Sequence, residues 1–466
     1  MNPVRIHLAS VLFLVAMALS AQQPGAQPWL QVMGITVSGN KVTKERIILR
    51  EMLVHEGDSL PASAFYDQLE RSRQNLMNTG LFNTVTLLPV YLDLNKVFIE
   101  VQVNERWYLW PALVLELADP NFNTFLQFRD LGRVNYGLYL NQYNFRGRNE
   151  SIYALVQLGY TRKFAMRYKA PFIDKDQRWG FSIGAAVLQQ AEITTGTVAN
   201  ERILVQNPDG SNRDEWKADL EVTLRRKHDV RHAWRVKFVD ASVTDTIVAV
   251  APNYFDGPSR STRFLSLGYT FIWDHRDARI FPRQGQYGEL RVDRHGIGLL
   301  SRSAPNITTA YATYKHWWKL HDKWTFALSL RGKRSFGIPS YYIQEGLGYG
   351  NHVRGFEYYV IDGEDFVLGK GNVIFQLLKP RTSRVEAIPL EAFRTLYFAL
   401  YLNLFADAGR VWDSLFAEQN FLANQWMGGY GAGLDLVTSY DQVVRIEYSF
   451  NSISERGLFL HFSQPF

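Results

Sequence analysis

The sequence of 466 residues contains no cysteine. This absence excludes disulfides, thiolate metal sites, iron–sulfur clusters, cysteine nucleophiles and a lipid-modified N-terminal cysteine. Long hydrophobic runs are also missing, because beyond the N-terminus no uncharged apolar stretch reaches the roughly 18 residues that a spanning helix needs. A helical membrane protein is therefore excluded.

Strong charge of one sign is missing too. Lys and Arg number 51 against 45 Asp and Glu, and the net charge of +6 is spread along the chain without a basic tract. Nucleic acid is therefore not an expected partner. Aromatic residues, in contrast, are abundant at 14%. This composition leaves two classes, a large soluble β-rich protein or a transmembrane β-barrel, whose alternating strands hide their hydrophobicity from averages.

Enzyme and cofactor signatures are weak or missing. No GxxxxGK[ST] or GxGxxG loop occurs. The GDSL tetrapeptide at residues 57–60 places Ser59 between two predicted helices, and not on the strand-to-helix elbow that a hydrolase nucleophile needs. His228, His232 and His275 lack regular metal spacing. We therefore predict no catalytic residues, no cofactor and no metal, and the protein is not expected to be an enzyme.

Residues 1–21 have the pattern of a secretory signal peptide. Arg5 supplies a positive charge, residues 8–19 are apolar, and small residues follow up to Ala21. The mature protein is therefore expected to be exported, which argues against a mechanism driven by ATP.

Residues 30–105 predict a small α/β domain of order β-α-α-β-β. A strand over residues 34–37 precedes a helix capped by Thr43, and a second helix begins near Pro61 and stops at Gly80. Two strands follow over residues 82–90 and 96–103, and the second alternates cleanly between apolar and polar positions.

This order resembles that of a POTRA domain, with Val37-Ser38-Gly39-Asn40, Gly57-Asp58-Ser59-Leu60 and Gly80-Leu81-Phe82 in sequence. The resemblance implies a periplasmic module that handles client polypeptides, partly by offering a sheet edge to an incoming strand. Such strand addition uses backbone hydrogen bonds and therefore tolerates many client sequences.

Residues 106–466 contain repeated alternating runs separated by polar turn residues. The clearest runs cover residues 285–293, 397–409 and 444–450, and in each an apolar face opposes a polar one. At about 20 to 23 residues per strand and connection, this length predicts an antiparallel transmembrane β-barrel of about 16 strands. A soluble sandwich would alternate as well, but it would bury the apolar face. The alternating end of the chain, closed by Phe466, resembles the C-terminal signal of bacterial outer-membrane proteins.

Several motifs in this region go beyond periodicity. Residues 144–149 lead through a strand to residues 168–172, and the other motif residues are Asp274, Arg276, Asp277, Pro282, Gly285, Val353, Arg354, Gly355, Phe356, Phe405, Asp407 and Gly409. Behind a POTRA module, they resemble the BamA/TamA superfamily of outer-membrane barrels, also called the bacterial surface antigen family.

That resemblance implies a loop that folds back into the lumen and an arginine on it that meets an acidic residue of the wall. These would be Arg354 and Asp407, with Gly355 in a tight turn and Phe356 wedged against the wall. Independently of the resemblance, Asp407 occupies one of the alternate positions of its strand that face the polar side. Asp274, Arg276 and Asp277 are interpreted as structural residues where a strand enters a turn.

The resemblance implies a factor for outer-membrane protein assembly, insertion or translocation. Expected partners are extended client polypeptides, outer-membrane lipid and lipopolysaccharide, and periplasmic accessory proteins. The chain departs from the family in having one POTRA, where BamA-type factors generally carry several and two-partner secretion transporters carry two. An alternative is a passive channel, a surface-binding barrel or a lipid-homeostasis barrel, whose POTRA docks a periplasmic partner. The basic residues 225–227 are interpreted as a solvated loop or a contact with lipopolysaccharide phosphates.

Overall fold

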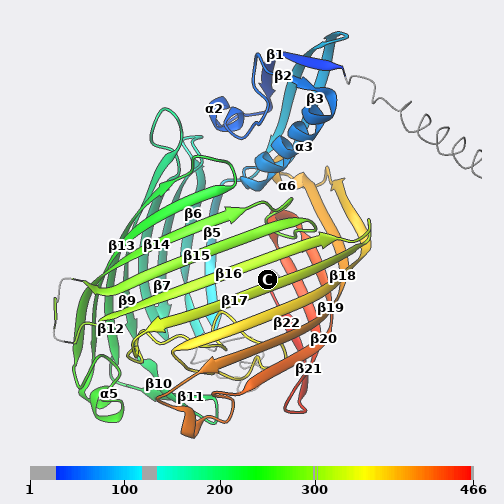
Figure 1. The fold of residues 1–466 in the computed structure, drawn as a ribbon. Helices are drawn as coiled ribbons and strands as arrows, with labels where there is room; N and C mark the ends of the chain where they lie inside the picture. The colour runs from blue at the N-terminus through cyan, green and yellow to red at the C-terminus, as the bar shows by residue number, and fades with distance from the viewer. Residues whose placement is uncertain (1–27, 118–133, 298–299, 302, 463–466) are drawn as a thin grey trace, which may run out of the picture.

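The computed structural model describes residues 28–117, 134–297, 300–301 and 303–462. The predicted signal peptide over residues 1–21 and the terminal Phe466 lie outside these residues. The described chain forms a small N-terminal domain and a large barrel, and the domain lies over one mouth of the barrel (Figure 1). None of the helices in the described ranges is long and apolar enough to cross a membrane.

The N-terminal domain confirms the predicted order β-α-α-β-β, with one short strand added. Its elements are β1 (Trp29–Ser38), α2 (Glu45–Leu49), β2 (Ser59–Pro61), α3 (Ala62–Asn78), β3 (Phe82–Asp93) and β4 (Lys96–Glu105). The sheet order is β2-β1-β4-β3, with β1 parallel to β4 and β3 antiparallel to it. The strand β3 therefore lies at a free edge of the sheet.

The core of this domain lies between α3 and the sheet. Phe65, Leu69 and Leu76 follow helical spacing along α3 and are buried. They share one hydrophobic cluster with alternate residues of β4, among them Val97 and Ile99. The alternation predicted for this strand is thus the pattern that buries one of its faces.

One local prediction is wrong, because Thr43 does not cap α2. The residue before the helix is Lys44, and no side chain caps it. The Thr43 hydroxyl instead donates to Glu105 Oε1 at the end of β4. The Glu105 carboxylate, 62 positions away in the chain, thus engages the hydroxyl that would otherwise cap the backbone N–H groups at the start of the helix.

The barrel sheet contains sixteen strands among the described residues, as predicted. They are β5 (Leu109–Leu117), β6 (Val134–Phe145), β7 (Glu150–Gly159), β8 (Thr161–Ala170), β9 (Trp179–Gln190), β12 (Arg213–Leu224), β13 (Val230–Val243), β14 (Ser261–Asp274), β15 (Gly285–Ile297), β16 (Ile307–Lys319), β17 (Trp324–Phe336), β18 (Asp365–Arg384), β19 (Thr395–Trp412), β20 (Trp426–Thr438), β21 (Val443–Asn451) and β22 (Arg456–His461).

Shorter elements lie at the two mouths of the barrel (Figure 1). Each barrel strand pairs antiparallel with its neighbour in the chain, except that β9 pairs with β12 across a separate hairpin. The remaining elements are β10 (Glu192–Val198), β11 (Glu201–Gln206), α5 (Asp245–Val250), α6 (Glu391–Arg394), η2 (Ala417–Gln419) and η3 (Ser439–Asp441). The hairpin β10–β11 and α5 lie at the mouth opposite the N-terminal domain (Figure 1).

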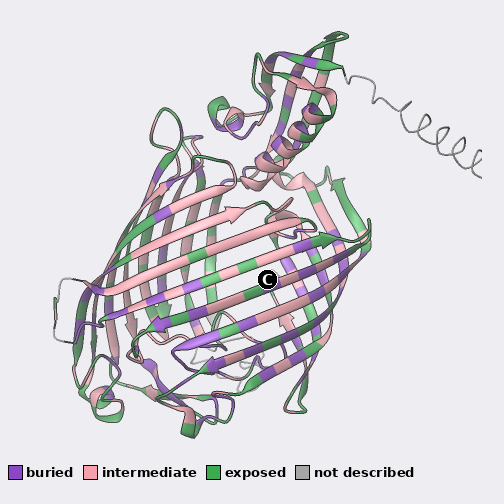
Figure 2. Cartoon of the chain, viewed as in Figure 1, coloured by how far each residue is buried: buried purple, intermediate pink, exposed green. Residues whose placement is uncertain are grey.

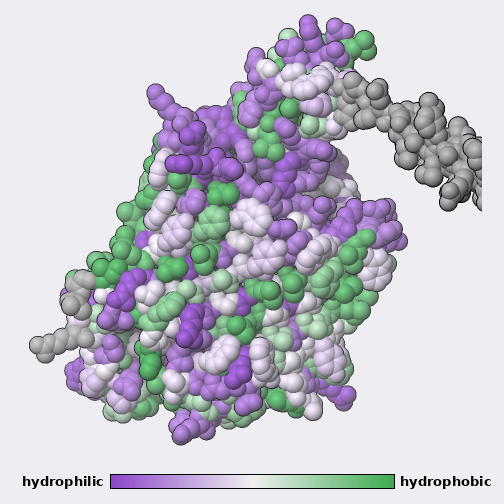
Figure 3. All heavy atoms as spheres, in the orientation of Figure 1, coloured by the Kyte–Doolittle hydropathy of each residue, from purple (hydrophilic) through white to green (hydrophobic). Residues whose placement is uncertain are grey.

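The barrel wall is apolar outside and polar inside. Leu404 and Ile446 point outward and are exposed, whereas Asn403 and Glu447 on the same strands are completely buried. The strands are accordingly banded by burial in Figure 2, and hydrophobic residues cover much of the wall in Figure 3. This arrangement is the reverse of a soluble sandwich and is typical of a lipid-spanning barrel.

Candidate functional site

A long loop between β17 and β18 folds into the barrel. We call residues 337–364 the lumen loop. Its apolar side chains Val353, Phe356 and Ile361 are buried in one hydrophobic cluster with Phe366 and Val411 of the wall. The loop is therefore held in the lumen by an apolar core of its own, and the polar contacts described next lie beside that core.

Arg354 is a charged residue of the loop and one of its most buried, with 1% of its surface exposed. Its Nε and one Nη donate to the two carboxylate oxygens of Asp407 at 2.8 and 2.6 Å. The same guanidinium donates to Asn372 Oδ1 at 2.7 Å and to Glu447 Oε1 at 3.3 Å. It also lies 3.8 Å from the ring centroid of Phe405. One side chain thereby joins the loop to β18, β19 and β21.

The contact between Arg354 and Asp407 is strong only when both charged partners are present. A bidentate arginine–carboxylate pair combines two charge-assisted hydrogen bonds. Burial removes water that would otherwise solvate either partner, so loss of one partner leaves a charge stranded. Further ion pairs extend the cluster, since Arg445 Nε donates to Asp435 at 2.9 Å and Lys370 Nζ lies 4.0 Å from Asp407.

Two motif glycines allow the close approach between loop and wall. Gly355 has φ +93°, in the region that favours glycine, and a Cβ there would lie 3.0 Å from Asn451 Cβ. The Asn451 amide donates to the Gly355 carbonyl at 2.7 Å. A Cβ at Gly409 would lie 2.8 Å from Val353. Phe356, next to Gly355, is completely buried.

The residues predicted at a strand-to-turn junction lie between β14 and β15. Arg276 donates to both oxygens of Asp274 at 2.8 Å. Asp277 accepts backbone N–H groups of Ala278 and Arg283 at 2.8 and 3.1 Å. Burial nevertheless raises the pKa of Asp277. These groups therefore shape the turn.

Two further motif residues close the same turn. Pro282 is buried, and Gly285 begins β15 with φ +114°. A Cβ at Gly285 would lie 2.2 Å from the carbonyl oxygen of His275, so only glycine fits this crossing.

This turn also contacts the N-terminal domain, a role that the motif itself does not reveal. Arg71 and Asn78 of α3 donate to the carbonyls of Arg276 and Asp277, each at 3.3 Å. The backbone N–H of Arg279 donates back to Asn78 Oδ1 at 3.0 Å.

The turn of residues 144–149, between β6 and β7, forms a second contact with the domain. The Asn144 amide donates to the Thr43 hydroxyl at 2.8 Å, and the Lys44 N–H donates to the Gly147 carbonyl at 2.9 Å. A Cβ at Gly147 would lie 2.0 Å from the Val42 carbonyl oxygen. This motif thus fits the domain closely against the barrel mouth.

The third contact is a buried ion pair. Arg225, in the turn after β12, donates to both oxygens of Glu51 at 2.7 and 3.0 Å, and Arg50 donates to the same carboxylate at 2.8 Å. Burial alone would raise the pKa of Glu51, but the two arginines lower it below its ordinary value. The interpretation of Arg225 as a solvated or lipopolysaccharide-binding residue is therefore wrong.

His228 adds a titratable group to this junction. Its Nε2 lies 2.7 Å from the Arg50 carbonyl, and burial lowers its pKa. The other histidines of the sequence prediction lie elsewhere: His275 pairs with Asp229 at 3.0 Å, and His232 Nδ1 lies 2.8 Å from the Tyr269 hydroxyl.

A seam interrupts the barrel sheet. The sheet begins at β5 and ends at β22, and no ladder between these two strands is formed by the described residues. Outward-facing leucines on both strands are highly exposed, with Leu115 at 77% and Leu458 at 65%. Within the described part of the chain, each of these two strands therefore has one edge without a ladder, and such an edge is open to pairing with another strand.

The N-terminal domain offers another free edge at β3. Leu88, Val90 and Leu92 on this strand are exposed. Pro89 lies in the same strand, in keeping with the preference of proline for sheet edges.

Sequence reasoning missed several partners in the lumen. Glu447 could have been found, because it lies on the polar face of the alternating run over residues 444–450. Asn372 and Glu357 carry no such signal, because neither lies in one of these alternating runs and their partners Arg354 and His461 come from other elements.

Comparisons with known proteins match both parts of the chain. The model of the Omp85 superfamily domain matches residues 144–451, and the POTRA model, described as a surface antigen variable number repeat, matches residues 31–106. The outer membrane protein assembly factor BamA of Neorickettsia risticii (strain Illinois) is 36% identical over 76 residues. That match covers 16% of this chain and only 10% of that protein.

Two solved structures share the fold at low sequence identity. BamA from Haemophilus ducreyi lacking POTRA domains 1–3 has a TM-score of 0.53 and 14% identity, with 93% of this chain and 84% of that chain covered. CdiB from Escherichia coli has a TM-score of 0.54 and 12% identity, with 92% and 75% covered. The chain therefore belongs to the Omp85 superfamily, as an outer-membrane β-barrel with a single periplasmic POTRA domain.

Proposed function

We propose that this protein inserts client polypeptides into the outer membrane or translocates them across it. The observation that carries this function is the seam, where β5 and β22 are the only neighbouring ends of the described barrel sheet without a ladder. The work is divided among an export signal at residues 1–21, a capture domain at residues 30–105 and a barrel at residues 106–466. No covalent chemistry is required.

Client capture takes place at the free edge β3 of the POTRA domain. An extended client adds as a further strand and pairs through its backbone, so its side chains matter little. The exposed Leu88, Val90 and Leu92 supply apolar contacts for client residues of alternating character. Outer-membrane clients are rich in such alternating strands.

The seam then offers the client a second edge, within the membrane. An unpaired backbone group in hydrocarbon costs several kcal/mol, so both β5 and β22 gain by pairing with a client strand. Folding and lipid burial of the client supply the driving force, which suits a compartment without ATP. Outer-membrane lipid, lipopolysaccharide and periplasmic accessory proteins complete the proposed set of partners.

Cross-linking the seam tests this mechanism. The natural chain has no cysteine, so Leu113→Cys on β5 and Leu458→Cys on β22 create one reactive pair, and both positions are exposed. A thiol-reactive bifunctional reagent that joins them is expected to abolish insertion of a radiolabelled outer-membrane protein into proteoliposomes. Insertion should remain when either single variant is treated.

A matched pair on continuously paired strands provides the control. Leu434 on β20 and Ile446 on β21 are register partners, and both side chains are exposed on the lipid side. A cross-link between cysteines at these positions should leave insertion unchanged. Full insertion by the seam-linked protein would contradict a lateral route through the seam.

A further inference from the structure

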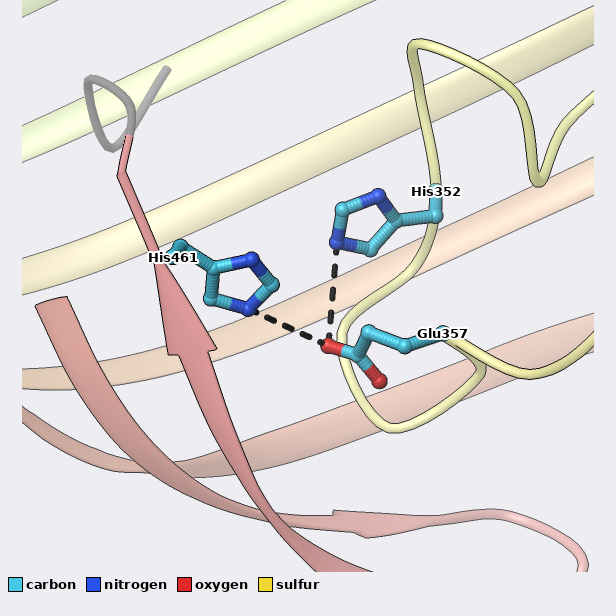
Figure 4. A group of neighbouring side chains, drawn as sticks. All are labelled: His352, Glu357 and His461. Carbon is cyan, nitrogen blue, oxygen red and sulfur yellow. Dashed lines mark ion pairs between the residues drawn. The ribbon is translucent and has the colours of Figure 1, made fainter. Parts of the chain in front are cut away.

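Two histidines and a glutamate converge in the lumen beside the Arg354 cluster. His352 and Glu357 belong to the lumen loop and flank Arg354 in sequence, whereas His461 lies on β22. Both imidazole rings face the Glu357 carboxylate (Figure 4). The His352 and His461 Nε2 atoms lie 3.6 and 3.8 Å from Glu357 Oε1. All three ligand atoms lie within 4.8 Å of one another.

These separations fit a tetrahedral Zn²⁺ centre with small adjustments. Ligand atoms bound at about 2.1 Å in a tetrahedron lie about 3.4 Å apart, and two histidines with one carboxylate form a recognised zinc donor set. This group is the only cluster of at least three potential metal ligands within the described part of the chain.

The loop holds Glu357 in an orientation suited to binding. The Gly355 N–H donates to Glu357 Oε2 at 2.8 Å, so the other oxygen is directed toward the histidines. Outer hydrogen bonds of this kind orient metal ligands and limit their motion. His461 Nε2 makes no hydrogen bond within the described residues, although Glu447 Oε2 lies 3.5 Å away.

Charged side chains of both signs surround the cluster. Four carboxylates (Asp407, Asp435, Glu447 and Glu357) share this region with three cationic side chains (Arg354, Arg445 and Lys370). The ion pairs of Arg354 and Arg445 engage the first three carboxylates, and the two imidazoles face the fourth, Glu357.

We propose that His352, Glu357 and His461 bind one Zn²⁺ ion, which ties the lumen loop to β22. A water molecule or Glu447 completes the coordination. Because β22 forms one side of the seam, the bound metal restrains this edge of the barrel sheet. Only this last consequence rests on the proposed function, since metal binding itself requires no client.

Zinc titration of the purified chain tests the site directly. The full-length protein, in detergent and without a polyhistidine tag, is stripped of metal and titrated with ZnCl₂ by calorimetry, and bound zinc is counted after dialysis. We expect one Zn²⁺ per chain. His352→Ala and His461→Ala should each weaken binding at least about tenfold, since even outer-shell changes cost that much. MgCl₂ should not compete, because Mg²⁺ prefers oxygen ligands.

The histidine on β13 supplies the matched control. His232 contacts Tyr269 and lies outside the cluster, so His232→Ala should bind zinc like the natural chain. Zinc should also slow amide hydrogen exchange in β22 of the natural chain but not of His352→Ala. Heat-dependent gel migration verifies folding, and His352→Ala alters a loop residue, so it remains informative if the strand variant misfolds. Absence of stoichiometric zinc binding, or zinc affinity in both cluster variants equal to that of the natural chain, would overturn the site.

Discussion

At the scale of single residues, Arg354 depends on groups that arrive from three separate strands. It donates four side-chain hydrogen bonds, to Asn372, Asp407 and Glu447. None of these acceptors can be replaced by water, because the whole set is buried. A lysine could keep the charge but could not reproduce the planar fork.

Removal of Arg354 should destabilise the folded barrel strongly. Arg354→Ala strands Asp407 and Glu447 in the lumen, so we expect a loss of about 3 to 5 kcal/mol. Asp407→Ala should cost a similar amount, and the double variant much less than their sum. Arg354→Lys should lose less stability than Arg354→Ala but should be less stable than the natural chain. The unfolding midpoint in urea, followed by heat-dependent gel migration, measures each variant.

A more exposed lumen pair serves as the control for this cycle. Arg235 donates to Glu221 at 2.6 Å, and 43% of the Arg235 side chain is exposed. Arg235→Ala should therefore cost no more than about 1 kcal/mol. Purely additive effects of Arg354→Ala and Asp407→Ala would argue against a single cooperative contact.

At the scale of elements, the barrel contacts the POTRA domain through its turns and through the short helix α6. The turns after β6, β12 and β14 each contact it. The carboxylate of Glu51 between Arg225 and Arg50 is the buried ion pair among these contacts. Further contacts come from the turn after β8 and from α6, where Arg50 donates to the Gln177 carbonyl and Asn83 of β3 donates to the Ala392 carbonyl. The orientation of the edge strand β3 relative to the seam therefore depends on several short connections.

Docking of the POTRA domain should weaken in acid. The pKa of His228 is lowered by burial, and the pKa of Glu51 is lowered by its arginines despite burial. The undocked protein therefore binds more protons than the docked one, His228 on the barrel and Glu51 on the domain. Docking is full above about pH 6.5 and declines as pH falls, with a second loss below about pH 4.3. Labels at the exposed positions Asp67→Cys on the domain and Lys175→Cys on the barrel measure the docking. The distance between the two labels is followed from pH 8 to pH 4.

Two variants separate the contribution of Glu51. Glu51→Gln should dock more weakly at every pH and lose the lower phase. Glu70→Gln, which breaks an exposed pair with Arg73 on α3, should follow the natural curve. Identical pH curves for Glu51→Gln and the natural chain would show that Glu51 does not hold the junction.

Elements with a clear period were predictable from the sequence, and contacts between distant segments were not. The run over residues 397–409 places Asp407 on the lumen face by parity alone, and β19 buries those alternate residues. The alternation of polar and apolar residues, however, predicts strands and their faces but not the positions of loops. The convergence of His352 with His461 and the attachment of Glu51 to Arg225 are both set by tertiary structure across more than a hundred positions.

At the scale of the whole molecule, we expect the lumen loop to limit ion flow through the barrel. Its apolar cluster and the Arg354 contacts occupy the lumen side of β18 to β21. A passive channel would need that space to be open. The same loop therefore distinguishes the proposed function from a porin-like one.

Removal of the loop should open the barrel to ions. In planar bilayers we expect the natural chain to show small, irregular conductance, and a variant without residues 345–363 to show larger and steadier openings. Deletion of residues 207–211 at the same mouth, in the connection after β11, is the control and should not increase conductance. Large, steady openings of the natural chain would favour the passive-channel alternative.

The three-strand attachment of Arg354 also constrains the order in which the barrel itself folds. Its acceptors lie 18, 53 and 93 positions further along the chain. The loop therefore cannot complete its contacts until β18, β19 and β21 have paired. Contacts of such long sequence separation form slowly, because loop closure must precede them. Docking of Arg354 is thus a late event in the barrel's own folding, and it marks a wall that is nearly complete before the lumen is filled.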